Sequence, residues 1–279
     1  MALENDGLST QVGQSRKFSA SWPTVTALVI FGVVVIEFIL SPLFQQRAQH
    51  QLTSQFNAMV TKAATAIGQD GVSPLPDTAP DYGSAVAVVT IPKLGLTQVV
   101  VEGISSNFTQ SGPGHVPGTV LPGQAGESTI VGRRTTFGAP FFNLGSLQTG
   151  DLIKVVTVEG PSTYKVIDTA KTENLTSANT LKLVTSTPPV LAFGSSAVTA
   201  ELQAKPYPAT PKNARTAPST NQFALMVLLL QVLIFALYLS RGIYRRFGPI
   251  IGWLLLAPLV GGSVVALTLA LDTLLPASI

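Results

Sequence analysis

The sequence predicts an all-β domain, a barrel or a sandwich, joined to membrane-spanning helices. Three observations predict it: short β-rich runs between turn residues over residues 85–202, long apolar runs outside this region, and an amphipathic stretch ahead of it. Only 11% of the 279 residues are charged, against roughly 25% in an average soluble domain. Because 46% are hydrophobic and the mean hydropathy is +0.40, the composition disfavours a purely soluble protein. The length allows one or two domains.

The residue types that are missing or rare exclude several classes of function. The chain has no cysteine, which excludes disulfides, thiolate metal sites, iron–sulfur clusters and a cysteine nucleophile. His50 and His115 are far apart, so we expect no histidine-rich metal site. The net charge of +3 is small and scattered, which does not favour nucleic-acid binding. We therefore expect no metal, no cofactor and no nucleic-acid partner.

Three apolar runs outside the β region predict three transmembrane helices, which we place at residues 23–44, 222–240 and 250–272. Crossing ~30 Å of hydrocarbon takes about 20 residues, and a core helix of a soluble domain would show a polar face over this length. The first run could instead be a cleaved signal peptide, since basic residues precede it. The following Ser41-Pro-Leu-Phe-Gln-Gln-Arg has no clear cleavage site, so we interpret the run as an uncleaved anchor.

Two groups of basic residues predict the orientation of these spans. One group precedes the first span, and the other fills the short loop 241–249 between the second and third. The positive-inside rule places both groups in the cytoplasm. The N-terminal residues 1–22 are then cytoplasmic, whereas the β region and the tail 273–279 face outward. We therefore expect a multi-pass protein of the cell membrane. The residues that set this orientation are Arg16, Lys17, Arg241, Arg245 and Arg246.

The spans carry a few polar side chains. Glu37 and Asp272 lie near the outer ends of the first and third spans, and Gln231 lies near the middle of the second. Polar residues within a membrane suggest function, although acids near the interface are easily solvated. Gly261-Gly-Ser allows close helix packing. A simple anchor does not need the C-terminal pair of spans, so we expect a membrane-embedded or cell-surface protein partner.

The segments that flank the β region predict a stalk and two linkers. Apolar residues recur at helical spacing over residues 45–67, which predicts an amphipathic helix standing off the membrane. Its stripe packs either on the adjacent domain or on a partner helix. Residues 68–84 and 203–221 are rich in turn residues and predict linkers, the second stiffened by proline. The stripe consists of Leu52, Phe56, Met59, Val60, Ala63 and Ile67.

Seven short runs in residues 85–202 are rich in β-branched residues and are separated by Gly, Pro, Asn and Asp. This pattern is typical of an all-β barrel or sandwich, and no run there predicts a long helix. The predicted strands are Val86–Thr90, Gln98–Val101, Ser128–Val131, Leu152–Val158, Ser162–Ile167, Thr180–Thr185 and Ala197–Leu202.

Six motifs follow one another in this region. They are Ile91-Pro-Lys-Leu-Gly-Leu, Gly112-Pro-Gly-His-Val-Pro-Gly-Thr with Leu121-Pro-Gly-Gln, Gly132-Arg-Arg-Thr-Thr-Phe-Gly-Ala-Pro-Phe, Leu147-x-x-Gly-Asp, Leu181-Lys-Leu-Val-Thr-Ser-Thr-Pro and Ser195-Ser-Ala-Val-Thr-Ala-Glu-Leu. In this order and spacing, the chain resembles the sortases, membrane-anchored cysteine transpeptidases of Gram-positive bacteria, and in particular the actinobacterial class E type. The resemblance implies a sortase-type β-barrel over residues 85–202.

The same resemblance implies a site in which every catalytic side chain is replaced. A sortase uses a cysteine thiolate to attack the peptide, a histidine to carry the proton, and an arginine to stabilise the thiolate or the oxyanion. Aligned motif by motif, the cysteine falls on Ser186, the histidine on Arg133 and the arginine on Ser195. We therefore expect no catalytic residue at these degenerate positions.

Ser186 could still act as a nucleophile if a base accepted its proton. Arg133 cannot be that base, because its guanidinium stays protonated. Lys182 lies four residues earlier on the same strand, roughly 13 Å away along an extended chain. His115 lies in a glycine–proline loop that is not catalytic in the family. We therefore interpret Ser186 as a small polar residue in a retained groove.

Arg133 has two interpretations, and Arg134 has one. Arg133 is either a solvated charge at a strand end or part of a cationic floor that pairs with a carboxylate of a bound peptide. Arg134 is shared with the family motif, so a structural role is its interpretation. With Ser186 and His115, these arginines make up the predicted groove.

Three functions fit these observations. The favoured one is a sortase-fold pseudoenzyme that binds a partner or supports an assembly at the cell surface, with a peptide segment as a candidate occupant of the groove. The second is an active transpeptidase or hydrolase that uses Ser186. The third is an accessory regulator of a true sortase.

Overall fold

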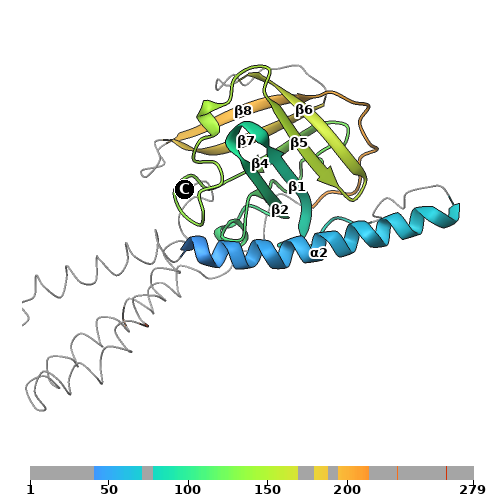
Figure 1. The fold of residues 1–279 in the computed structure, drawn as a ribbon, viewed down its shortest axis with the longest axis horizontal. Coiled ribbons are helices and arrows are strands. Elements are labelled where there is room, and N and C mark those ends of the chain that lie inside the picture. The colour runs from blue at the N-terminus through green and yellow to red at the C-terminus, as the bar shows by residue number, and fades with distance from the viewer. Residues whose placement is uncertain are drawn as a thin grey trace, which may run out of the picture.

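The computed structural model describes residues 41–70, 78–168, 179–187 and 194–213, together with Gln231 and Gly262. In these residues, a closed eight-stranded barrel packs against one long helix, α2 (Figure 1). The described stretches contain no helix that is long and apolar enough to cross a bilayer. The predicted spans lie outside the described residues, apart from residues 41–44 and the helical, exposed Gln231 and Gly262.

The barrel closes in the order β1-β2-β3-β4-β7-β8-β6-β5, and β5 pairs back onto β1. The β2–β3 and β4–β7 pairs are parallel, and the other pairs are antiparallel. The strands are β1 Ala85–Ile91, β2 Leu96–Glu102, β3 Gly114–His115, β4 Glu127–Val131, β5 Leu152–Thr157, β6 Gly160–Asp168, β7 Thr180–Thr187 and β8 Gly194–Leu202. The predicted barrel is therefore confirmed, and the sandwich alternative is wrong.

Alternating side chains explain why these segments form a barrel. In β5, Ile153, Val155 and Thr157 are buried, whereas Leu152 and Val156 are exposed, as the two-residue period of a strand requires. The buried side chains of the other strands meet them in one core. Its largest aromatic and aliphatic members are Tyr164, Phe141, Ile91, Ile130, Leu144, Leu181 and Leu183.

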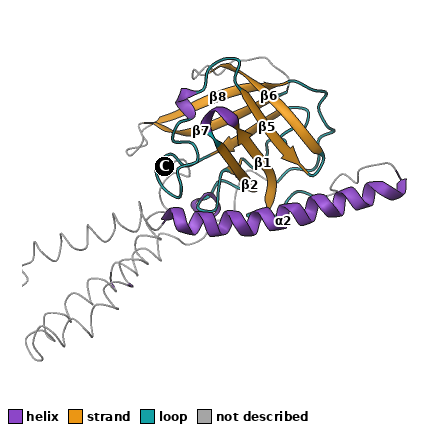
Figure 2. Ribbon diagram, in the orientation of Figure 1, coloured by secondary structure: helices purple, strands orange, loops and turns teal. Residues whose placement is uncertain are grey.

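All seven predicted strands are present in the described residues, with ends shifted by a few positions. The eighth, β3, was missed because it has only two residues, Gly114 and His115. Its glycine has a packing role: a Cβ at Gly114 would collide with the carbonyl oxygen of Gly103. The other described helical elements are short: α3 Ser106–Thr109 and the 3-10 turns Pro92–Leu94 and Leu144–Ser146 (Figure 2).

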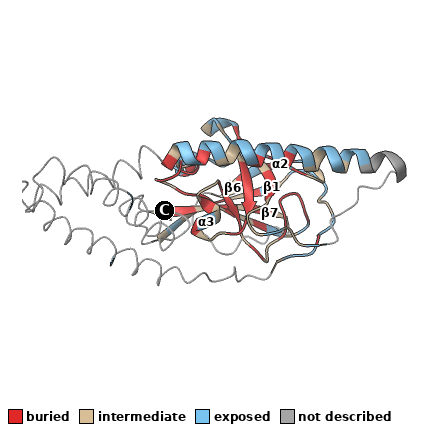
Figure 3. Cartoon of the chain, turned by 90° about the horizontal axis from the view of Figure 1, so that it is seen from below, coloured by how far each residue is buried: buried red, intermediate tan, exposed pale blue. Residues whose placement is uncertain are grey.

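Helix α2 spans Ser41–Asp70, several residues longer at its N-terminal end than the predicted stalk 45–67. Its buried Leu52 and Phe56 pack against Ala85 in β1 and against Val99 and Val101 in β2, so the stripe packs on the barrel as expected. The opposite face is exposed (Figure 3).

Gln49 fixes α2 to β2 through its side-chain amide. Its Oε1 accepts a hydrogen bond from the Val99 backbone N–H at 2.7 Å, and its Nε2 donates to the Val99 carbonyl at 3.0 Å. The same Nε2 donates to the Ser111 carbonyl at 2.6 Å. One glutamine thereby pairs with the N–H and carbonyl groups of Val99 and with the Ser111 carbonyl. Buried backbone groups of this kind need such partners.

The segment after β8 lies along the barrel in its described part, residues 203–213. The Tyr207 backbone N–H donates to the Gly123 carbonyl at 2.8 Å, and the Tyr207 carbonyl accepts from Ala125 N–H at 3.1 Å. We call this segment the strap. It forms the first half of the Pro-rich segment 203–221 that the sequence predicts as a linker.

Candidate functional site

The structure brings Arg133, Ser186 and Ser195, the three positions predicted from the motifs, to one end of the barrel. Ser186 in β7 and Ser195 in β8 are direct partners across the antiparallel pair. Arg133 follows β4, whose parallel pairing with β7 continues beyond the strand: Gly132 N–H donates to the Val184 carbonyl at 2.9 Å, and Thr185 Oγ1 donates to the Gly132 carbonyl at 2.8 Å. This convergence confirms only the shared location of the three positions.

Arg133 points into the protein. Its side chain is fully buried, so the interpretation as a solvated strand-end charge is wrong. Nη2 donates to Ser106 Oγ at 2.7 Å and to the Ser106 carbonyl at 3.2 Å, and Nη1 donates to Thr136 Oγ1 at 3.0 Å. The guanidinium carbon also lies 4.9 Å from the centre of the Phe137 ring, within the range of a cation–π interaction. Arg133 therefore ties the loop after β4 to α3.

Arg134 contacts the position of the nucleophile directly. Its Nη1 donates to the Ser186 backbone carbonyl at 2.8 Å. Its Nε is buried and has no hydrogen-bond partner among the described residues. Of the two arginines, Arg134 is thus the one that lies beside Ser186.

Ser186 is completely buried, and its Oγ has no hydrogen-bond partner in the described part of the protein. A serine nucleophile needs a base that accepts its proton. No hydrogen bond joins Ser186 Oγ to Lys182, His115 or another described residue. The arrangement lacks the pairing that would activate this hydroxyl.

The chain that covers this end of the barrel has an unusual backbone. Phe137, Gly138 and Ala139 have positive φ angles of 47°, 70° and 45°, which are uncommon for residues other than glycine. The loop is held by α2, because Phe137 N–H donates to Ser41 Oγ at 3.1 Å. Gly138 also packs so closely on Gln45 that a Cβ there would overlap its side chain.

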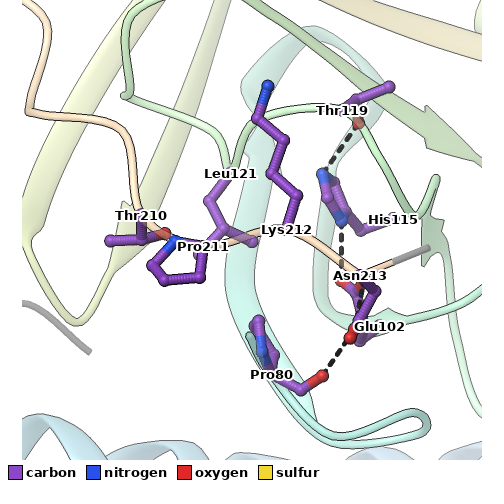
Figure 4. Close-up of a pocket in the computed structure, with 9 residues that line it drawn as sticks. All are labelled: Pro80, Glu102, His115, Thr119, Leu121, Thr210, Pro211, Lys212 and Asn213. Carbon is purple, nitrogen blue, oxygen red and sulfur yellow. Dashed lines mark hydrogen bonds and ion pairs between the residues drawn. The ribbon is translucent and has the colours of Figure 1, made fainter. Parts of the chain in front are cut away.

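His115 lies elsewhere, in β3, in a buried cluster with Glu102 of β2 (Figure 4). His115 Nδ1 is 2.6 Å from Glu102 Oε2, and Nε2 is 2.9 Å from the Val120 carbonyl and 3.0 Å from Thr119 Oγ1. This order of groups resembles a hydroxyl–histidine–carboxylate triad. Thr119 Oγ1 donates to the Val116 carbonyl at 2.7 Å, so its proton is not directed at His115. The hydrogen bonds of His115 hold it in this cluster, and its place in the predicted groove stays a prediction.

The strap closes the far side of this cluster. Asn213 Nδ2 donates to Glu102 Oε1 at 3.0 Å and to the Pro80 carbonyl at 2.6 Å. A small cavity remains, with about 200 Å³ of space not filled by atoms, open solvent included. Its walls are Pro80, Glu102, His115, Thr119, Leu121, Thr210, Pro211, Lys212 and Asn213. Sequence reasoning missed the pairing of Glu102 with Asn213, because the two residues are 111 positions apart.

A second polar cluster joins the strap to the barrel. Gln124 is buried, and its Nε2 donates to Glu159 Oε1 at 2.6 Å and to Thr210 Oγ1 at 2.8 Å. Burial raises the pKa of Glu159, although the hydrogen bond from Gln124 opposes this shift. Burial also raises the pKa of Tyr164 to about 12, and the nearby Glu159 carboxylate adds to this rise. Tyr164 accepts the Gly123 N–H at 2.6 Å.

Among the described residues, no group of three or more His, Asp or Glu side chains could hold a metal ion. Of the polar residues predicted in the spans, Glu37 and Asp272 lie outside the described part of the chain, and Gln231 is described only as helical and exposed.

Comparison with known proteins identifies the barrel. Residues 89–194 match the family model described as the sortase domain. A 90-residue stretch is 29% identical to Sortase D of Bacillus subtilis (strain 168), and it covers 32% of this chain and 44% of that protein. The chain thus matches less than half the length of this curated relative.

Two solved structures are also similar. The Sortase D5 transpeptidase of Clostridium perfringens is 23% identical, with 57% of this chain and 98% of that chain covered and a TM-score of 0.44. Sortase E1 of Streptomyces coelicolor, solved with a tripeptide in its active site, is 25% identical, with 52% and 98% covered and a TM-score of 0.40. Residues 89–194, which include most of the β-barrel, thus match the sortase domain model.

Proposed function

We propose that this protein is a sortase-fold pseudoenzyme that binds a partner or supports an assembly at the outer face of the cell membrane. The observation that carries the proposal is the burial of Arg133. At the position of the proton carrier it places a guanidinium that cannot lose its proton and whose side chain is bonded to Ser106 and Thr136. This arginine is part of the fold.

The other two positions support the same conclusion. Acyl transfer by a sortase-type site needs a nucleophile, a proton carrier and a positive charge at the developing oxyanion. Ser186 Oγ has no base within hydrogen-bond distance among the described residues, and Ser195 carries no charge. Arg134 is the cation beside Ser186, and its Nη1 is bonded to a backbone carbonyl.

An active transpeptidase or hydrolase is the second candidate. One observation favours it: the Ser186 hydroxyl makes no hydrogen bond in the described part of the protein. The side chain is buried, so a ligand would reach it only after the surrounding chain opens. The same hydroxyl, together with Arg134 Nε, could donate to a carbonyl or carboxylate of a bound peptide without any reaction. The two candidates thus share a peptide groove and differ in chemistry. A regulator of a true sortase is a third candidate and would use the same groove.

The membrane location and the class are part of the proposal. The support for the location is the sequence: three apolar runs and the arginine-rich loop 241–249 predict an outward-facing barrel. The support for a class E-like, actinobacterial type is the set of six motifs from Ile91 to Leu202. A C-terminal pair of spans would add lateral contacts to a membrane-embedded partner.

Site-specific cross-linking in native membranes tests the binding role. Because the chain lacks cysteine, Ser195→Cys offers one thiol for a photo-cross-linker at the exposed edge of the site. Leu152→Cys, on the exposed face of β5, is the matched control. We expect a discrete adduct from position 195 that the control does not form. No adduct, or the same adducts from both positions, would overturn the binding role.

A further inference from the structure

Three large apolar side chains are strongly exposed, two in the first turn of α2 and one after the loop that packs on this turn: Leu43 at 52%, Phe44 at 50% and Phe142 at 55%. We call them the apolar patch. The other exposed large hydrophobic residues of the described part, Leu152 and Val156, lie on β5. Exposed aromatic side chains at one place indicate a contact with a partner or a membrane.

The patch combines two segments that are about 100 positions apart. Leu43 and Phe44 belong to the first turn of α2, whereas Phe142 follows the loop after β4. That loop packs on the same turn of α2, because Phe137 N–H donates to Ser41 Oγ at 3.1 Å and Gly138 contacts Gln45. The side chains of Ser41 and Gln45 are buried, with only 2% and 3% of their surface exposed. The barrel thus contacts the N-terminal end of the helix directly.

The sequence before α2 indicates what the apolar patch contacts. Residues 23–40 are apolar apart from two threonines and Glu37, and we predict a span over residues 23–44. Leu43 and Phe44 are therefore the outer end of that span. Because a loop of the barrel packs on Ser41 and Gln45, this loop lies at the level where the span leaves the hydrocarbon.

The chemistry of the residues around the patch fits a bilayer interface. Phe and Leu side chains on interfacial helices lie at the boundary between headgroups and acyl chains. Arg47, one turn further along α2, is exposed and can reach lipid phosphate. A membrane occupant explains why apolar side chains of the helix and of the barrel loop are exposed together.

We propose that the apolar patch rests in the outer interface of the bilayer, with Phe142 as a membrane contact of the barrel itself. The proposal rests on the membrane location proposed above. The end of the barrel that carries Ser186 and Arg134 then faces the membrane surface. Its partner would be a segment that emerges from the bilayer close to this protein.

Fluorescence quenching in vesicles tests this proposal with the full chain. Phe142→Cys labelled with bimane is reconstituted in phosphatidylcholine vesicles whose acyl chains are brominated near the headgroups. A side chain buried 5–10 Å into the interface should lose about half of its fluorescence. Leu152→Cys is the control and should lose almost none. A second label at Asn143→Cys should lose its quenching when Phe142→Asp is added.

The outcomes separate this proposal from the one on which it rests. A label at Val34→Cys reports the predicted span. If Val34 is quenched and Phe142 behaves like Leu152, the membrane contact of the barrel is wrong while the anchor stands. If Val34 is not quenched either, the membrane location fails too. If Phe142 is shielded from aqueous iodide but not quenched by lipid, a protein surface covers it and the lipid proposal is overturned.

Discussion

Arg133 Nη2 donates to Ser106 Oγ at 2.7 Å, and both side chains are buried. This contact joins the loop after β4 to α3, two segments that are 27 positions apart. Arg133, which we align with the proton carrier of the sortase motif, is thereby a structural link. A buried arginine is stable only where acceptors satisfy its donors.

Ser106→Ala should destabilise the barrel. It removes the hydroxyl that accepts from Arg133 Nη2 at 2.7 Å and keeps the longer bond to the Ser106 carbonyl. The loss should lower the free energy of unfolding by about 1–3 kcal/mol. Urea titration measures the change. Ser105→Ala is the matched control, because Ser105 makes no side-chain cap hydrogen bond, and should change stability by less than about 0.5 kcal/mol. Equal losses in both variants would contradict the structural role of Arg133.

Phe56→Ala should loosen α2 from the barrel. The Phe56 ring is 3% exposed against β1 and β2, so the cavity left behind should cost about 3–5 kcal/mol of stability. Phe44→Ala changes the same residue type on the same helix at a half-exposed position. In detergent, proteolysis should cut α2 of the Phe56 variant first. If both variants resist equally, α2 does not depend on this packing.

Glu159→Gln should alter the dependence of stability on pH. Because burial raises the pKa of Glu159 above its ordinary value of 4.5, the folded state binds the proton more tightly than the unfolded state. The contribution of Glu159 to stability is then greatest below pH 4.5, and it falls as the pH rises through the pKa of Glu159 in the folded state. Glutamine keeps an acceptor for Gln124 and cannot ionise.

The Glu159→Gln variant should therefore be more stable than the natural protein at pH 7, with the gain vanishing below pH 4.5. Urea titrations at pH 4 and pH 7 measure the difference, provided that the barrel unfolds reversibly at both. A variant that is less stable at pH 7 would show that the Glu159 carboxylate is favourable in the fold.

Asn213→Ala should release the strap. Glu102 Oε1 and the Pro80 carbonyl would lose their common donor, at a cost of about 1–3 kcal/mol. Hydrogen exchange at the Tyr207 N–H, which donates to Gly123, should become faster. Lys212→Ala, at the exposed neighbouring position, should leave this exchange unchanged. Unchanged exchange in the Asn213 variant would mean that the strap is held elsewhere.

The sequence predicted the parts of the fold that depend on local patterns. Runs of β-branched residues indicated seven strands, and the stripe with Leu52 and Phe56 indicated that α2 packs on the barrel. β3 has no such run, because two residues carry no periodicity. The strap looked like a linker because its prolines obscure the contacts of Tyr207 and Asn213, which depend on groups far away in the chain.

The sequence predicted which residues lie at the candidate site. It did not predict the directions and hydrogen bonds of their side chains. The motifs placed Arg133, Ser186 and Ser195 together because they align with one end of three strands. The nearby acceptor Thr136 does not by itself show that the Arg133 side chain turns inward, and its other acceptor, Ser106, lies in another segment. His115 was assigned to the groove by its motif, whereas its hydrogen bonds hold it at Glu102 and Val120.

The most direct test of the central claim is mass spectrometry of the full chain after incubation with a labelled sorting-type peptide and an amine acceptor. We predict no acyl adduct and no product for the natural protein. We expect the same for Ser186→Cys, because a thiol at this position would still lack a histidine. An adduct on Ser186 with turnover that disappears in Ser186→Ala would contradict the loss of chemistry.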